Sequence, residues 1–154
     1  MTTVGQPSRR LHLVFSGSAP DVMPQVETIG TFLREAGCAA ESAQKLVIVA
    51  EEILTNIARH AWVGQEAGCC SVDIAAVPKD GAIEVTLRTE DGGLAFDPTK
   101  APEPDLEASL EERAIGGLGI VLIRSMTDAQ TYRRSGVRNI FEVTKRCAWA
   151  QAAC

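Results

Sequence analysis

Residues 46–62 read LVIVAEEILTNIARHAW, and this stretch decides the fold. Its apolar side chains recur at helical spacing, at Leu46, Ala50, Ile53 and Ile57. The same run carries two carboxylates and an amide near its centre, Glu51, Glu52 and Asn56. Buried groups of this kind cost free energy unless something compensates them. The stretch therefore predicts a long helix, residues 39–61, that packs on a core and needs a partner for its polar side chains.

The segments around this helix predict the rest of the domain. A strand is expected at residues 11–15 and a first helix at residues 22–37. Alternating apolar residues predict a hairpin of residues 70–76 and 83–88, and a second hairpin follows a short helix near the C-terminus. The predicted fold class is α+β: a two-layer sandwich with an antiparallel or mixed, mostly antiparallel, sheet and helices on one face.

Composition narrows the function classes. A chain of 154 residues fits one domain, expected at residues 11–146 between an N-terminal tail, 1–10, and a C-terminal tail, 147–154. The net charge of −5 and the short, scattered basic clusters argue against a direct nucleic-acid ligand. No apolar run approaches the roughly 20 residues of a membrane span, and the N-terminus lacks a signal-peptide core. The cytoplasm is therefore the expected location.

The five cysteines form no CxxC pair. Cys69 and Cys70 are adjacent, so on a strand they would point to opposite faces. Free thiols in a reducing compartment are the expected state.

The first motif is the stripe formed by Glu52 and Asn56, with His60 one turn further on. Residues four apart on a helix project from the same side. A carboxylate and an amide placed in this way could serve one cation, and magnesium prefers such oxygen ligands. The alternative interpretation is the solvated face of an amphipathic helix.

The second motif is DGGLAFDP, residues 91–98, directly after a predicted strand. Asp91 at the strand end could accept a hydrogen bond from the exocyclic amine of a purine, and the glycines could let the backbone approach a flat ring. An ordinary Asp-Gly-Gly turn is the alternative.

The third motif is GGLG, residues 116–119, which opens the short helix. Glycines at a helix N-terminus leave backbone N–H groups exposed at the positive end of the dipole, where anions bind. A flexible hinge is the alternative. The segment before it, with three prolines and an acidic run, is long for a plain connector, and such loops are often functional or mobile.

The three motifs together resemble the GHKL (Bergerat-fold) ATPases, and within them the small anti-sigma factor serine/threonine kinases of bacterial partner-switching systems. EEILTNIARHAW looks like the family's N-box and EDGGLAFDP like its G1 box. IGGLGIVLIRSMTD, followed by YRRSGVRNIFEVTK, looks like its G2 region and terminal hairpin. The resemblance extends from about Leu11 to Arg146, in element order as well as motif order.

Carried over residue by residue, this resemblance implies a set of ATP-binding residues. Asn56 matches the magnesium ligand, and Glu52 matches the general base that takes a proton from a serine hydroxyl. Asp91 matches the adenine-reading aspartate, with Gly93 beside it. The phosphate-contacting turn would comprise Gly116, Gly117 and Gly119, with Leu118 and Ile120 in the same segment. Residues 98–115 would form the nucleotide lid.

Two positions depart from the family pattern. Ala95 stands where a second glycine is frequent, and Asn139 stands where a threonine often lies near the adenine. Alanine is small enough to be tolerated, and Asn139 is expected to keep a hydrogen bond to the nucleotide.

The resemblance implies an ATP- and Mg²⁺-dependent serine/threonine kinase and anti-sigma factor. It would phosphorylate a small antagonist protein of the STAS type, sequester a sigma factor or a similar target, and pair as a homodimer. Three alternatives remain: a non-catalytic ATP- or ADP-binding regulator, a detached histidine-kinase ATPase domain, and an α+β domain without nucleotide. The kinase interpretation also predicts that Glu52 and Asn56 lie exposed in a cleft when no nucleotide is bound.

Overall fold

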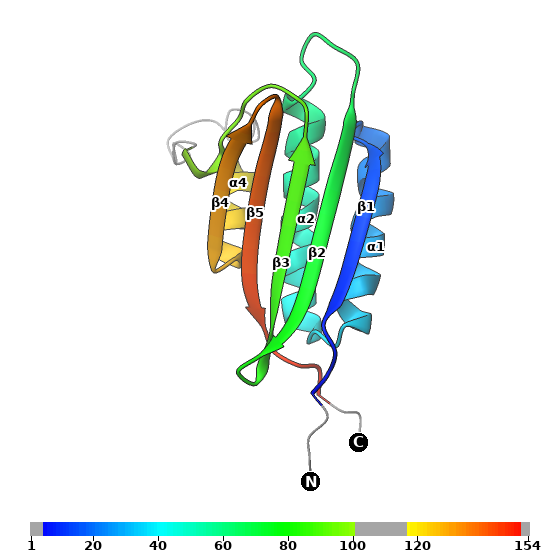
Figure 1. The fold of residues 1–154 in the computed structure, drawn as a ribbon, viewed down its shortest axis with the longest axis vertical. Coiled ribbons are helices and arrows are strands. Elements are labelled where there is room, and N and C mark those ends of the chain that lie inside the picture. Colours follow the sequence, from blue (N-terminus) through cyan, green and yellow to red (C-terminus); the bar gives the residue numbers. More distant parts are fainter. Residues whose placement is uncertain (1–4, 101–116, 152–154) are drawn as a thin grey trace.

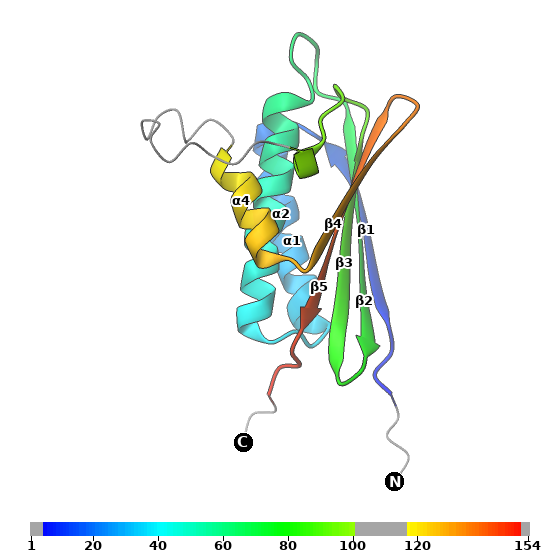
Figure 2. The ribbon, with the colours of Figure 1, turned by 90° about the vertical axis from the view of Figure 1, so that its left-hand side faces the viewer.

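The computed structural model describes residues 5–100 and 117–151, which form two layers. A five-stranded sheet makes one layer, and the helices cover one of its faces (Figures 1 and 2). The other face of the sheet carries no helix in this part of the chain. The α+β sandwich predicted from the sequence is therefore confirmed.

The sheet is antiparallel throughout the described strands. These are β1 (Arg9–Ser16), β2 (Cys69–Lys79), β3 (Ala82–Asp91), β4 (Ala129–Ser135) and β5 (Arg138–Cys147). Their spatial order is β1-β2-β3-β5-β4, and all four pairings are antiparallel. The sequence predicted either an antiparallel or a mixed sheet, and the described strands form an antiparallel one. Its register places Asp91 directly opposite Asn139.

The helices are α1 (Val22–Glu35), α2 (Ala40–His60) and α4 (Gly117–Met126), with short 3₁₀ turns η1 (Ala19–Asp21) and η2 (Pro98–Lys100). Within the described ranges, no helix combines the length and apolarity needed to cross a membrane. The expected tails require correction, because Arg9 and Arg10 belong to β1 and Cys147 ends β5. These residues extend the outer ends of β1 and β5, and they gain backbone hydrogen bonds by doing so.

The apolar face of α2 packs on the sheet as its periodicity predicts. Leu46, Ala50 and Ile53 are buried, and Ile57 packs against the same core. Burying a leucine or isoleucine side chain stabilises a fold by about 1.5–3 kcal/mol. Glu51 is exposed. The position of α2 against the core determines where its polar residues lie.

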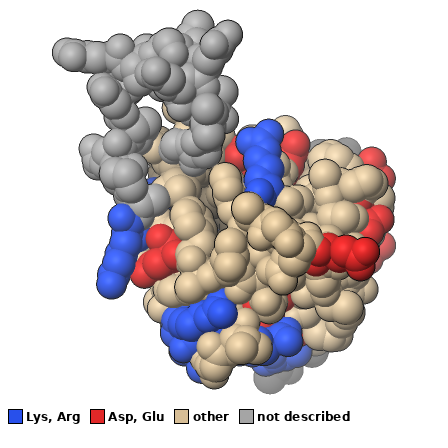
Figure 3. All heavy atoms as spheres, turned by 90° about the horizontal axis from the view of Figure 1, so that it is seen from above, with Lys and Arg blue, Asp and Glu red and all other residues tan. Residues whose placement is uncertain are grey.

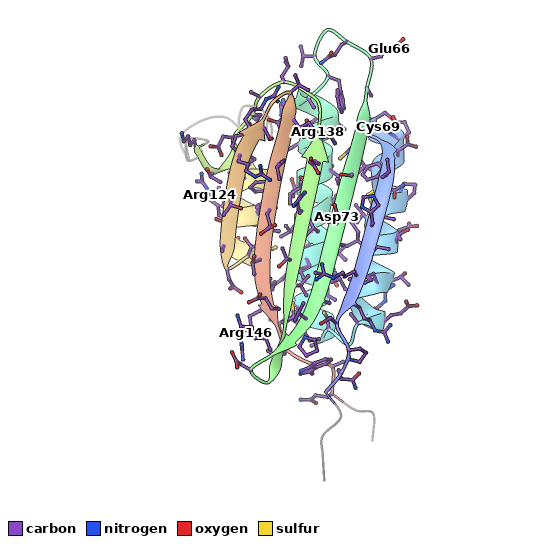
Figure 4. All side chains as sticks on the ribbon, viewed as in Figure 1. Glu66, Cys69, Asp73, Arg124, Arg138 and Arg146 are labelled. Carbon is purple, nitrogen blue, oxygen red and sulfur yellow. The ribbon has the colours of Figure 1, made fainter. Side chains whose placement is uncertain are left out.

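The adjacent cysteines lie on opposite sides of β2. Cys69 is exposed near the start of the strand (Figure 4), whereas Cys70 is buried. Cys38, Cys69, Cys70 and Cys147 form no disulfide with one another. Burial, reinforced by the negative charge of Asp91, raises the pKa of the Cys70 thiol to about 12.

We predict that iodoacetamide at pH 8 modifies Cys69 and spares Cys70 in the native protein. Only the thiolate reacts, and Cys70 is both buried and held in its protonated form. Tandem mass spectrometry of the peptide that contains both residues measures the two yields. Labelling in urea is the control, and it should modify both. Equal native labelling of the two thiols would contradict the burial of Cys70.

Candidate functional site

A pocket lies between the C-terminal half of α2 and the neighbouring ends of β3 and β5. Its apolar wall includes Ile53, Ile57, Leu94, Ile123 and Phe141. Its polar wall includes Asn56, Thr89, Asp91, Tyr132 and Asn139. Figure 3 looks onto this end of the molecule, where charged side chains border a largely uncharged central surface. An apolar cavity with a few convergent polar groups is the usual form of a small-molecule site.

Asp91 ends β3 on the pocket wall and is 4% exposed. Its Oδ1 accepts hydrogen bonds from the backbone N–H of Gly93, at 2.9 Å, and from Nδ2 of Asn139, at 3.0 Å. Among the described residues, no hydrogen bond reaches Oδ2. One carboxylate oxygen of a buried residue is therefore left to accept a hydrogen bond from a ligand.

Gly93 is required by the packing of the loop after β3 against the end of α2. The N–H of Leu94 donates to the carbonyl oxygen of Ala61 at 3.0 Å. A Cβ on Gly93 would overlap the Cβ, Cα and carbonyl oxygen of Ala61. Packing against Ala61 therefore explains why this position is a glycine. The close approach to a flat ring that the sequence suggested is a separate explanation.

We predict that Gly93→Ala lowers the stability of the fold by about 1–3 kcal/mol, since the overlapping atoms include backbone that cannot move aside cheaply. The melting temperature should fall by roughly 2–4 °C for each kcal/mol in a domain of this size. Gly92→Ala is the matched control, because a Cβ there meets only an ordinary contact at 4.0 Å. Equal melting temperatures for the two variants would contradict the packing argument.

Asn56 lines the pocket and is 9% exposed. Its carboxamide forms no hydrogen bond with any described residue. The expectation of an exposed Asn56 is therefore wrong, because the pocket wall encloses the side chain on α2. One turn further on, the ring of His60 stacks on Phe96 with centroids 5.9 Å apart, and both rings line the pocket. An amide that faces a cavity and has no hydrogen bond from the described residues fits a polar ligand.

Glu52 lies one turn before Asn56 and is half-buried, so it is also less exposed than expected. Within the described part of the chain its carboxylate has no hydrogen bond or ion pair. It lies against α4: a Cβ on Gly119 would overlap Oε2 of Glu52. The absence of a side chain at Gly119 lets the first turn of α4 approach this carboxylate.

The other residues of the glycine-rich motif have distinct positions. Gly117 begins α4, while Gly116 lies outside the described residues, as do residues 101–115 of the expected lid. Leu118 is 48% exposed and Ile120 is 7% exposed. The side chains of both are apolar, so only their backbone groups could contact a phosphate.

Arg124 ties the start of the expected lid to α4. Its Nη2 donates to the carbonyl oxygens of Pro98, at 3.3 Å, and Thr99, at 2.9 Å. Figure 4 labels Arg124 at the α4 side of the sheet. Pro98 also lines the pocket, so this arginine holds one edge of the cavity in place.

Sequence reasoning missed two residues of β4 that contact the site. The Tyr132 hydroxyl donates to Oδ1 of Asn139 at 2.6 Å, and Nη1 of Arg134 donates to the Gly93 carbonyl oxygen at 2.8 Å. Alternation along residues 131–135 places Tyr132 and Arg134 on the same face of a strand. That pattern does not reveal which neighbouring strand they would meet.

Comparison with known proteins identifies the family. Residues 19–145 match the histidine kinase-like ATPase domain family. The chain is 32% identical over 103 residues to the serine/threonine-protein kinase BtrW of Bordetella bronchiseptica, covering 67% of this chain and 70% of that protein. It is 35% identical over 107 residues to the serine-protein kinase RsbW of Listeria monocytogenes, covering 66% of each.

A solved structure supports the fold. The crystal structure of the SiaB–SiaC complex from Pseudomonas aeruginosa contains a chain that superposes with a TM-score of 0.52 and 19% identity, covering 87% of this chain and 89% of that one. The resemblance carried by the three motifs is thereby confirmed at the level of the family. The chain belongs to the histidine kinase-like ATPase domain family, in the branch that holds these serine/threonine-protein kinases.

Proposed function

We propose that this chain is an ATP-dependent serine/threonine kinase and anti-sigma factor that phosphorylates a small antagonist protein. One observation carries the proposal: one pocket presents an oxygen of Asp91 and the amide of Asn56, and no residue that the structure describes forms a hydrogen bond with either. Two polar groups that are open to a partner in one apolar cavity fit a ligand that has a polar base at one end and phosphates at the other.

At the base end, Oδ2 of Asp91 would accept a hydrogen bond from the exocyclic amine of adenine. The apolar wall supplied by Ile57, Leu94 and Phe141 suits the faces of a flat ring. The stacked rings of His60 and Phe96 add to that wall. The protein thus recognises the base through one hydrogen bond to a buried carboxylate and through apolar contact.

At the phosphate end, Asn56 is the protein ligand proposed for magnesium. Its carboxamide oxygen has no competing partner in the described residues, which fits an ion that takes oxygen ligands and keeps several waters. When bound, the ion would neutralise charge on the phosphate oxygens. The N-terminus of α4 lies beside Glu52, and its backbone N–H groups would complete the anion site.

Glu52 is the proposed general base. The serine oxygen of the antagonist bonds to the γ-phosphorus, the bond from that phosphorus to the bridging oxygen of ADP breaks, and the serine proton goes to the Glu52 carboxylate. That carboxylate is half-buried and unpaired within the described ranges, so it is available to accept a proton. Phosphoryl transfer needs positioning and charge neutralisation above all.

The partners follow from the family resemblance. The phosphorylated protein would be of the STAS type, and a sigma factor or a similar regulator would be the sequestered target. A homodimer in the cytoplasm is the expected form. Light scattering of the purified chain measures the oligomeric state.

The kinase is tested by mixing the purified chain with its candidate antagonist, magnesium and γ-labelled ATP. We expect label on an antagonist serine, stable in acid. No transfer under saturating magnesium, with ATP bound, would favour a non-catalytic regulator. Acid-labile label on a histidine would favour the histidine-kinase alternative. Absence of any ATP-induced rise in melting temperature would favour a domain without nucleotide.

A further inference from the structure

Asn139 uses all of its hydrogen-bonding capacity within the protein. It is 6% exposed and lies opposite Asp91 in the β3–β5 register. Its two Nδ2 hydrogens are directed to Oδ1 of Asp91, at 3.0 Å, and to the carbonyl oxygen of Leu94, at 2.8 Å. A carboxamide has only two N–H donors, so none remains for a nucleotide. The direct contact expected from the sequence is therefore replaced by a contact to Asp91.

The orientation of this amide is determined by its neighbours. Oδ1 of Asn139 faces the Tyr132 hydroxyl at 2.6 Å, Nη1 of Arg134 at 3.1 Å and the backbone N–H of Phe96 at 3.4 Å. The guanidinium and the backbone N–H can only donate, so they require the amide oxygen on their side. A flipped Asn139 would set N–H groups against these donors and lose both bonds from Nδ2.

The fixed orientation of Asn139 in turn fixes the orientation of the Asp91 carboxylate. Its Oδ1 receives Nδ2 of Asn139 and the N–H of Gly93, which sets the plane of the carboxylate. Oδ2 is then the oxygen left for a ligand in the pocket. An acceptor held in this way favours a base with an amine at the matching position and disfavours one with a carbonyl there, because two acceptors would then face each other.

We propose that Asn139 is a positioning residue for base specificity: oriented by Tyr132 and Arg134, it holds the Asp91 carboxylate in the plane that reads an exocyclic amine. This inference rests on the proposed ATP-binding function. Asn139 acts through Asp91 and makes no contact of its own with the nucleotide.

The test compares ATP with purine riboside triphosphate, which lacks only the 6-amino group, by calorimetric titration in the presence of magnesium. The native chain should bind ATP about tenfold or more tightly than the analogue, as expected for a hydrogen bond to a charged group. Asn139→Leu should reduce this preference to within about threefold, with affinity for the analogue nearly unchanged. Tyr132→Phe, which removes one orienting donor and keeps the ring, should reduce the preference by a smaller factor.

Two outcomes separate this inference from the function on which it rests. Equal loss of affinity for ATP and the analogue in Asn139→Leu would mean a direct or general structural role and would overturn the inference, while nucleotide binding by the native chain stands. No binding of either nucleotide by the native chain would overturn the proposed function itself. If Asn139→Leu does not fold, Tyr132→Phe is the deciding variant. A preference for ATP over the analogue that is unchanged in Tyr132→Phe would count against the inference. Arg133→Ala is the control. It changes an exposed residue of β4, the strand that carries Tyr132, and should keep the native preference for ATP.

Discussion

Glu52→Gln is expected to lower the rate of phosphoryl transfer by about 10²–10⁴-fold while ATP affinity stays within about threefold of the native value. The amide keeps the shape of the side chain and cannot accept the serine proton. Glu52 lies outside the pocket that would hold the base, and it has no hydrogen bond within the described residues that the change would break. Initial rates of label transfer and calorimetric titration with ATP measure the two quantities.

Glu51→Gln is the matched control for this experiment. Glu51 is the adjacent carboxylate, it is exposed, and a one-residue step turns it about 100° around the helix. Its change should leave both transfer and binding at native levels. Persistent transfer in Glu52→Gln, or an equal loss in Glu51→Gln, would refute Glu52 as the base.

Asn56→Leu is expected to abolish magnesium-dependent ATP binding without lowering the stability of the nucleotide-free protein. Asn56 has no hydrogen-bond partner in the described part of the chain, so the change breaks no hydrogen bond there, and its amide atoms are not among the fully buried unpaired ones. A leucine of similar volume therefore leaves no protein hydrogen bond broken, and stability should not fall. The native melting temperature should rise on adding ATP and magnesium, whereas that of the variant should not respond.

The same measurement separates a functional Asn56 from a structural one. If the amide stabilised the fold, Asn56→Leu would melt several degrees lower and could still bind ATP. Asn56→Asp is the companion variant, because it retains an oxygen ligand and should keep a magnesium-dependent response that Asn56→Leu loses. A magnesium-dependent response in Asn56→Leu that equals the native one would exclude this residue as the ligand.

The local sequence pattern was sufficient to predict the helices and strands and the α2 side of the site. The spacing of Leu46, Ala50 and Ile53 predicts the buried face of α2, and the step of four residues predicts that Glu52 and Asn56 share a side. Alternation predicted the opposite faces of Cys69 and Cys70. These predictions succeed because helix and strand periods depend only on neighbours along the chain.

The sequence predicted the burial of the site side chains less well than their positions along the helix. The sequence indicated exposed side chains at Glu52 and Asn56, yet Gly119 of α4 packs against the first and the pocket wall encloses the second. How deeply a helix face is covered depends on which other element docks beside it. The packing of α4 on α2 joins segments that are far apart in the sequence, which no local pattern encodes.

The sequence by itself therefore determined the two-layer fold, the strand and helix order and the polar stripe of α2, because each follows from local periodicity and turn chemistry. Only the tertiary structure decided that Asn139 is saturated by Asp91, Leu94, Tyr132 and Arg134, and that Gly93 is needed to pack against Ala61. The physical reason is register: Asp91 and Asn139 are 48 residues apart, and a shift of one residue between β3 and β5 would turn them to opposite faces of the sheet.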